Sequence, residues 1–365
     1  MYSINKIAIV GPLSPPAGGM ANLTFKLSEA ISQQDIEVDI IQTNSPYKFK
    51  IIEKLKGIRA VFRLFPYIFS LYRKTKHADV VHIMANSGWS WYLFSVPAIF
   101  ISKLNGKPIV VNYHGGNAEN FFANSWKWVD KSLQQVHCLI VPSKFLNAVF
   151  GRYGRDSIII PNVLDTTIFT KNNREFDQNN LHLIVTRNLE QIYGIHIIIK
   201  SFKIIVDKYP NTQLSIAGSG PDLEALKEQV EEYKLSNNIT FTGRLEANEI
   251  ALLYQSADIM LNASTIDNAP SSLLEALACG IPVVTSDVGG IPDMLSHEYD
   301  ALLVKKDDVL DISKQVFRLI DDQGLRESLV DNGLDTVQKY EWLIVWQQLL
   351  SCYQLAQKVW ETENV

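Results

Sequence analysis

Short apolar runs rich in β-branched residues alternate with segments of helical periodicity along most of this 365-residue chain. Near-continuous apolar runs, such as AIV at 8–10 and VVHI at 80–83, are typical of strands that helices bury on both faces. The pattern therefore predicts an α/β fold with parallel sheets. The expected strands lie at 6–11, 38–43, 79–84, 108–114, 138–142 and 158–161, and then at 182–186, 213–217, 239–242, 259–261, 282–285 and 301–304.

A polar segment, NNREFDQNN at 172–180, interrupts this rhythm and marks a domain boundary. A chain of this length exceeds what a single hydrophobic core usually supports. We therefore expect two doubly wound, Rossmann-like domains at 1–170 and 171–340, and a C-terminal helix at 341–365 that packs back on the first domain. Such domains bind ligands at the carboxyl ends of their strands, which places the expected site in a cleft between them.

Composition excludes several classes of protein. Apolar residues make up 47% and charged residues 20%, which rules out a disordered or collagen-like chain. The three scattered cysteines are too few for a disulfide framework or a four-ligand zinc site, so a reducing compartment is expected. No stretch reaches the roughly 20 apolar residues that span a bilayer, which predicts a protein that is soluble or lies on a surface.

The net charge of −5 hides an asymmetry between the two halves. Residues 1–165 carry 18 Lys and Arg and 10 Asp and Glu, a net charge of +8. Residues 166–365 carry the other 16 Lys and Arg and 29 Asp and Glu, a net charge of −13. Nine of the basic residues lie in the aromatic-rich segment 48–77, beside the single acid Glu53. This segment is interpreted either as an element that binds an anionic membrane surface or as a solvated helix pair with a core-facing apolar side. Nucleic acid is not an expected partner, because the remainder is acidic and has no recognition motif.

Two strand ends in the first half carry candidate binding groups. Gly18 and Gly19 precede a predicted helix, where backbone N–H groups and the helix dipole favour an anion. The loop lacks the G-x-G-x-x-G pattern, and no acid follows the second strand to hold a ribose, which disfavours a nicotinamide enzyme. His114 ends the strand at 108–114 and leads into Gly115-Gly116, so we expect its imidazole at the cleft.

The densest pattern follows the strand at 259–261. Asp267 lies in a loop, and Glu275 lies eight positions later in the helix that Pro270-Ser271 opens. The first-turn amides of that helix are free to bind an anion or a sugar hydroxyl. No D-x-D motif occurs in the chain, so a metal site of that kind is not expected.

The block SxxDNxPSSLLEALACGIPVV…DVGGIPD at 264–293 resembles the donor-binding region of the family 4 glycosyltransferases. These are retaining enzymes of GT-B architecture with an E-x7-E signature. VNYHGG (111–116), IIPNVLD (159–165) and AGSGPDLEALKEQV (217–230) resemble the same family in the same order. The resemblance covers nearly the whole chain.

The resemblance implies roles for residues in the second domain. Glu275 matches the acid that binds the nucleotide ribose. Asp267 stands where the family usually has its first glutamate, which implies a catalytic position near the transferred sugar. The amides of Asn268, Ala269 and Ser271 are then expected to face sugar hydroxyls.

The resemblance also implies that His114 is a second catalytic residue near the reacting centre, with Gly18-Gly19 close to the diphosphate. Arg187 matches an arginine that binds the diphosphate. Two residues depart from the family pattern. Tyr193 replaces a lysine that usually assists the arginine, and aspartate at 267 is one methylene shorter than glutamate.

Together these features predict a retaining, metal-independent hexosyltransferase with a nucleotide-diphosphate sugar as donor and no cofactor. The expected acceptor is a saccharide on the N-terminal domain, lipid-linked as in bacterial surface polysaccharide assembly. The expected location is the cytoplasm, peripheral on the inner face of the cell membrane. Two alternatives stay open: a sugar-nucleotide epimerase of similar architecture, and a catalytically silent nucleotide-sugar-binding subunit. The sequence does not specify the base, the sugar, the acceptor, the linkage or the oligomeric state.

Overall fold

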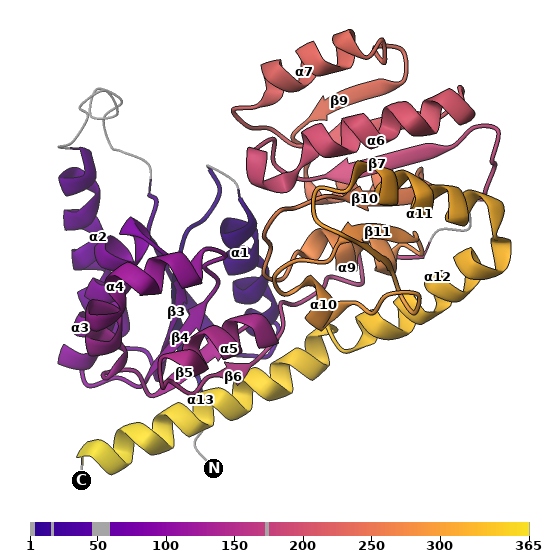
Figure 1. Cartoon of the computed structure of the whole chain (residues 1–365). Coiled ribbons are helices and arrows are strands. Elements are labelled where there is room, and N and C mark those ends of the chain that lie inside the picture. Colours follow the sequence, from indigo (N-terminus) through magenta and orange to yellow (C-terminus); the bar gives the residue numbers. More distant parts are fainter. Residues whose placement is uncertain (1–3, 16–17, 46–58, 172–174, 365) are drawn as a thin grey trace. The chain divides into compact units, whose positions relative to one another are not determined.

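The computed structural model describes residues 4–15, 18–45, 59–171 and 175–364, with side chains in the 59–75 helix described from residue 63. The chain divides into two compact units (Figure 1). Unit 1 comprises Met1–Val163 and Trp342–Val365, and unit 2 comprises Leu164–Glu341. Each unit is built on one six-stranded parallel sheet, so the expected α/β class with parallel sheets is confirmed.

Unit 1 has the strand order β2-β1-β3-β4-β5-β6. Its strands are β1 (Lys6–Gly11), β2 (Glu37–Gln42), β3 (Val80–Ala85), β4 (Ile109–Tyr113), β5 (Cys138–Val141) and β6 (Ile158–Ile159). All six lie where the hydrophobic pattern predicts them. The strand order reverses direction between β1 and β3, and the loops that leave these two strands therefore diverge at their carboxyl ends.

Helices cover both faces of this sheet. They are α1 (Gly19–Ser32), α2 (Arg59–Thr75), the π-helical turn η2 (Trp91–Ser95), α3 (Val96–Leu104), α4 (Ala118–Leu133), α5 (Lys144–Arg152) and α13 (Trp342–Asn364). One face packs with α2 to α5 around an aromatic cluster that includes Tyr113, Phe122 and Phe150. The other face packs with α1 and α13. Because both faces are covered, the apolar residues of the inner strands β1, β3, β4 and β5 are buried, whereas Ile158 and Ile159 of the edge strand β6 are exposed.

The C-terminal helix α13 belongs to unit 1, and Figure 1 shows it running beneath β4, β5 and β6. The buried Tyr353 of α13 places its hydroxyl 2.9 Å from Nδ1 of the buried His82 in β3. Next to it, Cys352 forms a disulfide with Cys138 of β5, across 214 positions of sequence. The fold thus brings together two cysteines that lie far apart in the sequence, and the compartment stays a prediction.

Unit 2 has the strand order β12-β11-β10-β7-β8-β9. Its strands are β7 (His182–Thr186), β8 (Gln213–Ala217), β9 (Ile239–Gly243), β10 (Ile259–Asn262), β11 (Val283–Ser286) and β12 (Leu302–Val304). Counted from β7, this is the 3-2-1-4-5-6 order of dinucleotide-binding sheets. Its switch point, where the order reverses, lies between β7 and β10.

The helices of unit 2 flank this sheet. They are the 3-10 turn η3 (Gln191–Tyr193), α6 (Ile195–Lys208), α7 (Leu223–Glu232), α8 (Ala247–Gln255), α9 (Ser271–Ala278), α10 (Ile291–Met294), α11 (Val309–Asp321) and α12 (Gln323–Gln338). The unit begins at Leu164, before the boundary expected after residue 170. Leu164 bridges Glu341, and Phe169 is buried in the core of unit 2. The boundary between the two units therefore lies where apolar residues begin to pack in the core of unit 2, and not at the polar segment 172–180.

The basic segment 48–77 is described only in part. Residues 48–58 lie outside the described residues, and α2 begins at Arg59. Within the described ranges, no helix has both the length and the apolar character needed to cross a bilayer.

The buried His82 predicts a pH-dependent stability. Burial, with a smaller contribution from His114, lowers the pKa of His82 from 6.5 to about 3. Unfolding lets this ring take up a proton that the folded state excludes, so stability is lost as the pH falls from 6.5 toward 3. His82→Asn should reduce the slope of unfolding free energy against pH by up to about 1.4 kcal/mol per unit. Urea titrations across this range measure it. The control is His77→Gln at an exposed position, and equal slopes for His82→Asn and the wild type would contradict the prediction.

Candidate active site

The switch point of unit 2 brings together two loops that the sequence analysis singled out. Arg187 directly follows β7, and the loop that contains Asp267 follows β10. The two strands are paired neighbours, with Met260 opposite Ile184. In open α/β sheets, ligands bind at this position, outside the carboxyl ends of the two strands.

Arg187 and Asp267 form an ion pair whose side chains are only 12% and 13% exposed. The guanidinium also reaches Ser272 Oγ at 3.4 Å, while Ser264 Oγ donates to Asp267 at 3.2 Å. Arg187 Nε is buried and has no partner within the described chain. A buried N–H of a cation without an acceptor is costly, so this group favours a site for an anion.

Tyr193, the residue that replaces the family's lysine, packs its ring against the same guanidinium. The ring centroid lies 4.3 Å from Arg187 Cζ, within the range of a cation–π contact. Burial raises the pKa of Tyr193, which keeps its phenol neutral. Tyr193 therefore contributes an aromatic face to the site, and no charge.

A glycine at position 194 lets the loop after β7 lie close to the backbone of Ala263, at the end of β10. Gly194, at φ +64°, follows Tyr193, and a Cβ there would lie 2.0 Å from the Ala263 carbonyl oxygen. The Thr265 N–H donates to the Ile192 carbonyl at 2.7 Å and joins the two loops again. These contacts hold the loop after β7 against the loop after β10.

Helix α9 begins at Ser271, four residues after Asp267. Pro270 caps the helix, which begins at Ser271, so the helix start predicted there is confirmed. The Asn268 N–H donates to Asp267 Oδ1 at 3.0 Å, and so this amide binds the carboxylate. Ala269 lies between Asn268 and the cap. The Asn268 amide is therefore bonded to Asp267, and the sugar-facing role expected of the amides at 268, 269 and 271 stays a prediction.

Glu275 lies half-buried in α9, near the hydroxyl of Tyr254. Burial and the charge of Glu275 raise the pKa of Tyr254 well above its usual value. The Tyr254 hydroxyl donates to the Ser272 carbonyl at 3.0 Å and lies 2.6 Å from Thr186 Oγ1. It therefore ties the end of β7 to α9. The sequence analysis missed Tyr254, which has no motif of its own, and also Ser264 and Ser272.

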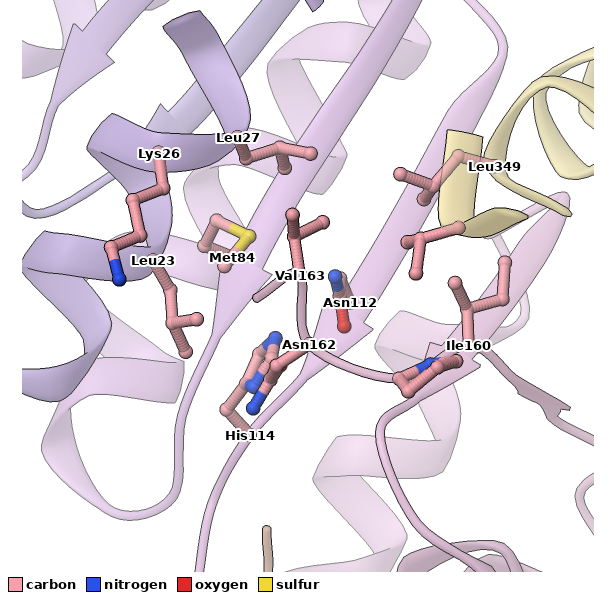
Figure 2. A pocket seen from close by; sticks show the side chains of 12 residues that line it. Leu23, Lys26, Leu27, Met84, Asn112, His114, Ile160, Asn162, Val163 and Leu349 are labelled. Atoms are coloured by element: carbon pink, nitrogen blue, oxygen red, sulfur yellow. The ribbon is translucent and has the colours of Figure 1, made fainter. Parts of the chain in front are cut away.

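Unit 1 contains a second candidate group around His114, shown in Figure 2. His114 follows β4, and its N–H donates to the Ala85 carbonyl at 2.9 Å. Asn112 lies two positions earlier and points to the same cavity. Burial lowers the pKa of His114 to about 4, so its imidazole is neutral at physiological pH.

The cavity beside His114 is small and mostly apolar. Its volume is about 30 Å³, and its walls come from α1, the ends of β3 and β4, the segment 160–163 and α13. His114 Nε2 and Asn112 Oδ1 are both buried without a partner in the described part of the chain. A space of this size admits about one or two water molecules or one polar group of a ligand. Asn112 is a candidate that the sequence analysis did not name.

Gly18 and Gly19 lie where α1 begins, with Gly18 as the extended N-cap residue. Nothing in the described structure occupies the space where a Cβ would stand on either glycine. The next turns of α1 supply Leu23, Lys26 and Leu27 to the cavity of His114. Among the residues that the structure describes, no cluster of three or more His, Cys, Asp or Glu side chains has the arrangement of a metal site.

Two family models match the chain in sequence. "Glycosyltransferase Family 4" matches residues 17–168, and "Glycosyl transferases group 1" matches residues 165–336. The N-acetyl-alpha-D-glucosaminyl L-malate synthase of Bacillus anthracis is 20% identical over 356 residues, which cover 88% of this chain and 90% of that protein. An uncharacterized glycosyltransferase of Methanocaldococcus jannaschii is 30% identical over 184 residues, and the match spans only 47% of its length. The Staphylococcus aureus capsular polysaccharide biosynthesis glycosyltransferase CapM is 29% identical over 161 residues, or 44% of this chain and 42% of CapM.

Solved structures show the same fold at low sequence identity. HepE of Anabaena, crystallised with UDP and glucose, superposes with a TM-score of 0.75 at 16% identity, covering 96% of this chain and 99% of HepE. Sucrose-phosphate synthase of Thermosynechococcus elongatus gives a TM-score of 0.76 at 19% identity, covering 96% and 98%. With its two family models end to end and its two parallel-sheet units, the chain belongs to the family 4 glycosyltransferases and has the GT-B fold.

Proposed function

We propose that this glycosyltransferase moves a hexose, with retention of configuration, from a nucleotide-diphosphate sugar to a saccharide acceptor. The observation that carries the proposal is the buried Arg187 at the switch point of unit 2, with its unpartnered Nε. HepE, of the same fold, binds UDP and glucose, which makes a UDP-sugar the first donor to test. CapM acts in capsular polysaccharide biosynthesis, which supports a role in bacterial surface polysaccharide assembly.

In the proposed reaction, Arg187 neutralises the diphosphate as it leaves. Charge-assisted hydrogen bonds from a guanidinium to phosphate stabilise the charge that develops on the leaving oxygen. To reach the phosphate, Arg187 exchanges part of its contact with Asp267 for the donor. Asp267 then faces the transferred sugar with the amides of Ala269 and Ser271, the Asn268 amide reaches the sugar on leaving Asp267 Oδ1, and Glu275 binds the ribose.

His114 acts in this proposal as a neutral group. With a pKa of about 4 its imidazole is uncharged at physiological pH, so in this proposal it positions a hydroxyl of the sugar and does not act as a general acid. The acceptor hydroxyl attacks the anomeric carbon, the bond to the diphosphate oxygen breaks, and that oxygen takes the acceptor's proton. The Gly18-Gly19 helix start adds N–H groups and a dipole for the diphosphate.

The proposed acceptor is a lipid-linked saccharide, bound by unit 1. The observation in favour is the basic composition of residues 48–77, with nine Lys and Arg against one acid. Such a segment is attracted to anionic lipid, which would hold the protein peripherally on the inner face of the cell membrane. The reaction needs no cofactor beyond the donor in this proposal.

A donor screen followed by product analysis tests the function. Thermal shifts with UDP-, GDP- and ADP-sugars identify the nucleotide. Incubation with donor and acceptor then separates three outcomes: a new glycoside supports a transferase, a new sugar nucleotide supports an epimerase, and binding without turnover supports a silent subunit. The anomeric coupling constant of the product tests retention, and an inverted product would overturn that part.

Arg187→Ala should weaken donor binding or turnover by about 1.5–3 kcal/mol, because it removes a charge-assisted contact to the diphosphate. Calorimetric titration with the nucleoside diphosphate and kcat/KM for transfer measure the effect. Arg244→Ala provides the matched control, since Arg244 lies elsewhere in unit 2 and is 38% exposed. Unchanged kcat/KM in Arg187→Ala would place the diphosphate at another strand end.

Tyr193→Leu should weaken diphosphate binding by about 0.5–2 kcal/mol, because the guanidinium loses the aromatic face that orients it. Tyr193→Phe keeps the ring and should retain most of the affinity. The comparison of the two variants by calorimetry isolates the ring from the hydroxyl. If Phe weakens binding as much as Leu does, the hydroxyl is the contributing group.

Transfer should be independent of divalent metal, because the sequence lacks the D-x-D motif on which many glycosyltransferases hold one. Initial rates in EDTA should therefore match those in Mg²⁺ or Mn²⁺. A rate that EDTA abolishes and Mn²⁺ restores would show that a metal neutralises the leaving diphosphate.

A further inference from the structure

Helices α2 and α3 of unit 1 present large apolar side chains to solvent. On α2, Phe65 is 72% exposed, Phe69 68% and Tyr72 53%. On α3, Phe100 is 60% and Leu104 65% exposed. We call these five residues the α2–α3 face. Single exposed apolar residues are common, but five on two packed helices are unusual for a surface that only meets water.

The packing of unit 1 does not require this face. Phe65, Phe69 and Tyr72 follow one another at spacings of four and three, which places them on one side of α2. The other side contains Tyr67 and Leu71, which are 3% and 0% exposed and pack into the core. Helix α2 is therefore apolar on both sides, and folding accounts for one of them only.

The two helices form one continuous surface. The Tyr67 hydroxyl donates to the Phe94 carbonyl at 2.7 Å, just before α3 begins. At the other end, Asn105 Nδ2 donates to the Tyr72 carbonyl at 2.9 Å and to Thr75 Oγ1 at 2.7 Å. These bonds hold the C-terminal half of α2 beside α3, and Figure 1 shows both helices on the same flank of unit 1.

The charged side chains on these two helices and their C-terminal ends have one sign, although Lys74 lies 3.9 Å from Asp39 of β2. Residues 59–77 contain five Lys and Arg, residues 89–107 contain two, and neither range contains an acid, in a chain of net charge −5. Arg73, Lys76 and Lys103 are exposed near the C-terminal ends of the two helices. A binding partner must therefore offer both an apolar medium and negative charge.

We propose that the α2–α3 face inserts into the interface of a bilayer with anionic headgroups. Aromatic side chains prefer this depth, and the adjacent basic side chains reach the lipid phosphates. A second copy of the chain fits less well, because the exposed Arg73, Lys76 and Lys103 of two such faces would repel one another. The inference rests on the proposed function in one respect: a lipid-linked acceptor supplies the reason for docking.

This surface differs from the segment that the charge pattern indicates. The sequence segment 48–77 includes α2 but not α3, and its apolar residues were equally consistent with a core-facing helix. The described part of α2 confirms a core-facing side, at Tyr67 and Leu71, and leaves an exposed apolar side on which the membrane contact is proposed. Phe100 and Leu104 come from a different stretch of sequence, which only the packing of α3 against α2 brings to the same surface.

Vesicle sedimentation tests the proposal. The full chain is mixed with phosphatidylcholine vesicles, with and without phosphatidylglycerol, and its bound fraction is measured. Phe65→Ser with Phe69→Ser should lower the partition coefficient on the anionic vesicles by about tenfold or more, since two buried aromatic side chains are lost. Leu252→Ser with Leu310→Ser is the matched control, because these side chains are 66% and 70% exposed on unit 2. Arg73→Gln with Lys76→Gln and Lys103→Gln should lower binding to the anionic vesicles only.

Vesicle binding by the Phe65/Phe69 variant at the wild-type level would overturn the proposal, as would equal loss in the Leu252/Leu310 control. Light scattering of the protein alone provides a further check. A wild-type dimer that is a monomer in the Phe65/Phe69 variant would assign the face to a second copy of the chain. Thermal melts confirm that each variant is folded. Nucleoside diphosphate titration reports on unit 2 separately: vesicle binding without nucleotide binding would reject the proposed function and keep the docking surface. If the protein binds nucleoside diphosphate and the Phe65/Phe69 variant binds vesicles as the wild type does, the docking surface is rejected and the proposed function is kept.

Discussion

Both units of this glycosyltransferase are organised by one requirement: the strands of a parallel sheet have to be covered by helices on both faces. Each strand must then continue into a helix, and every connection starts on the same side of the sheet, at the carboxyl ends of the strands. In unit 2 the order of the strands reverses between β7 and β10, so the loops after these two strands diverge and leave room for a ligand. Arg187, Tyr193 and Asp267 all lie in those loops.

The two residues that depart from the family pattern, Asp267 and Tyr193, both contact the side chain of Arg187. Asp267, the shorter acid, forms an ion pair with Arg187, and Tyr193, in place of the lysine, packs its ring on the guanidinium. Because both side chains of the ion pair are nearly buried, their attraction is little screened by solvent. Arg187 is thereby held in one orientation, with Nε left for an acceptor.

In unit 1, burial determines which functions are chemically available. His114 and His82 both lie in the interior, and burial lowers the pKa of each far enough to keep it neutral. His82 is used in packing, where it meets Tyr353 of α13. His114 and Asn112 instead turn unpartnered atoms toward a cavity. The two histidines of neighbouring strands thus differ in surroundings, because only His114 lies at a strand end and lines the cavity.

The sequence alone determined the class of fold, the position of all twelve strands and the ends at which the site residues lie. It could do so because burial on both faces imposes long apolar runs, and because tight turns and helix starts need glycine, proline and small polar residues at set places. The motif block around Asp267 and Glu275 likewise identified the family from local pattern.

Only the tertiary structure decided which of these residues touch. The Arg187–Asp267 pair joins positions 80 residues apart, and the Cys138–Cys352 disulfide joins positions 214 apart. Helix α3 packs beside α2 although β3 lies between them in the sequence. Contacts of this kind depend on the order of strands in a sheet and on the side from which a helix packs, and neither has a local sequence signal. The roles of Tyr193, Tyr254 and Asn112 therefore became visible only once packing had set their neighbours.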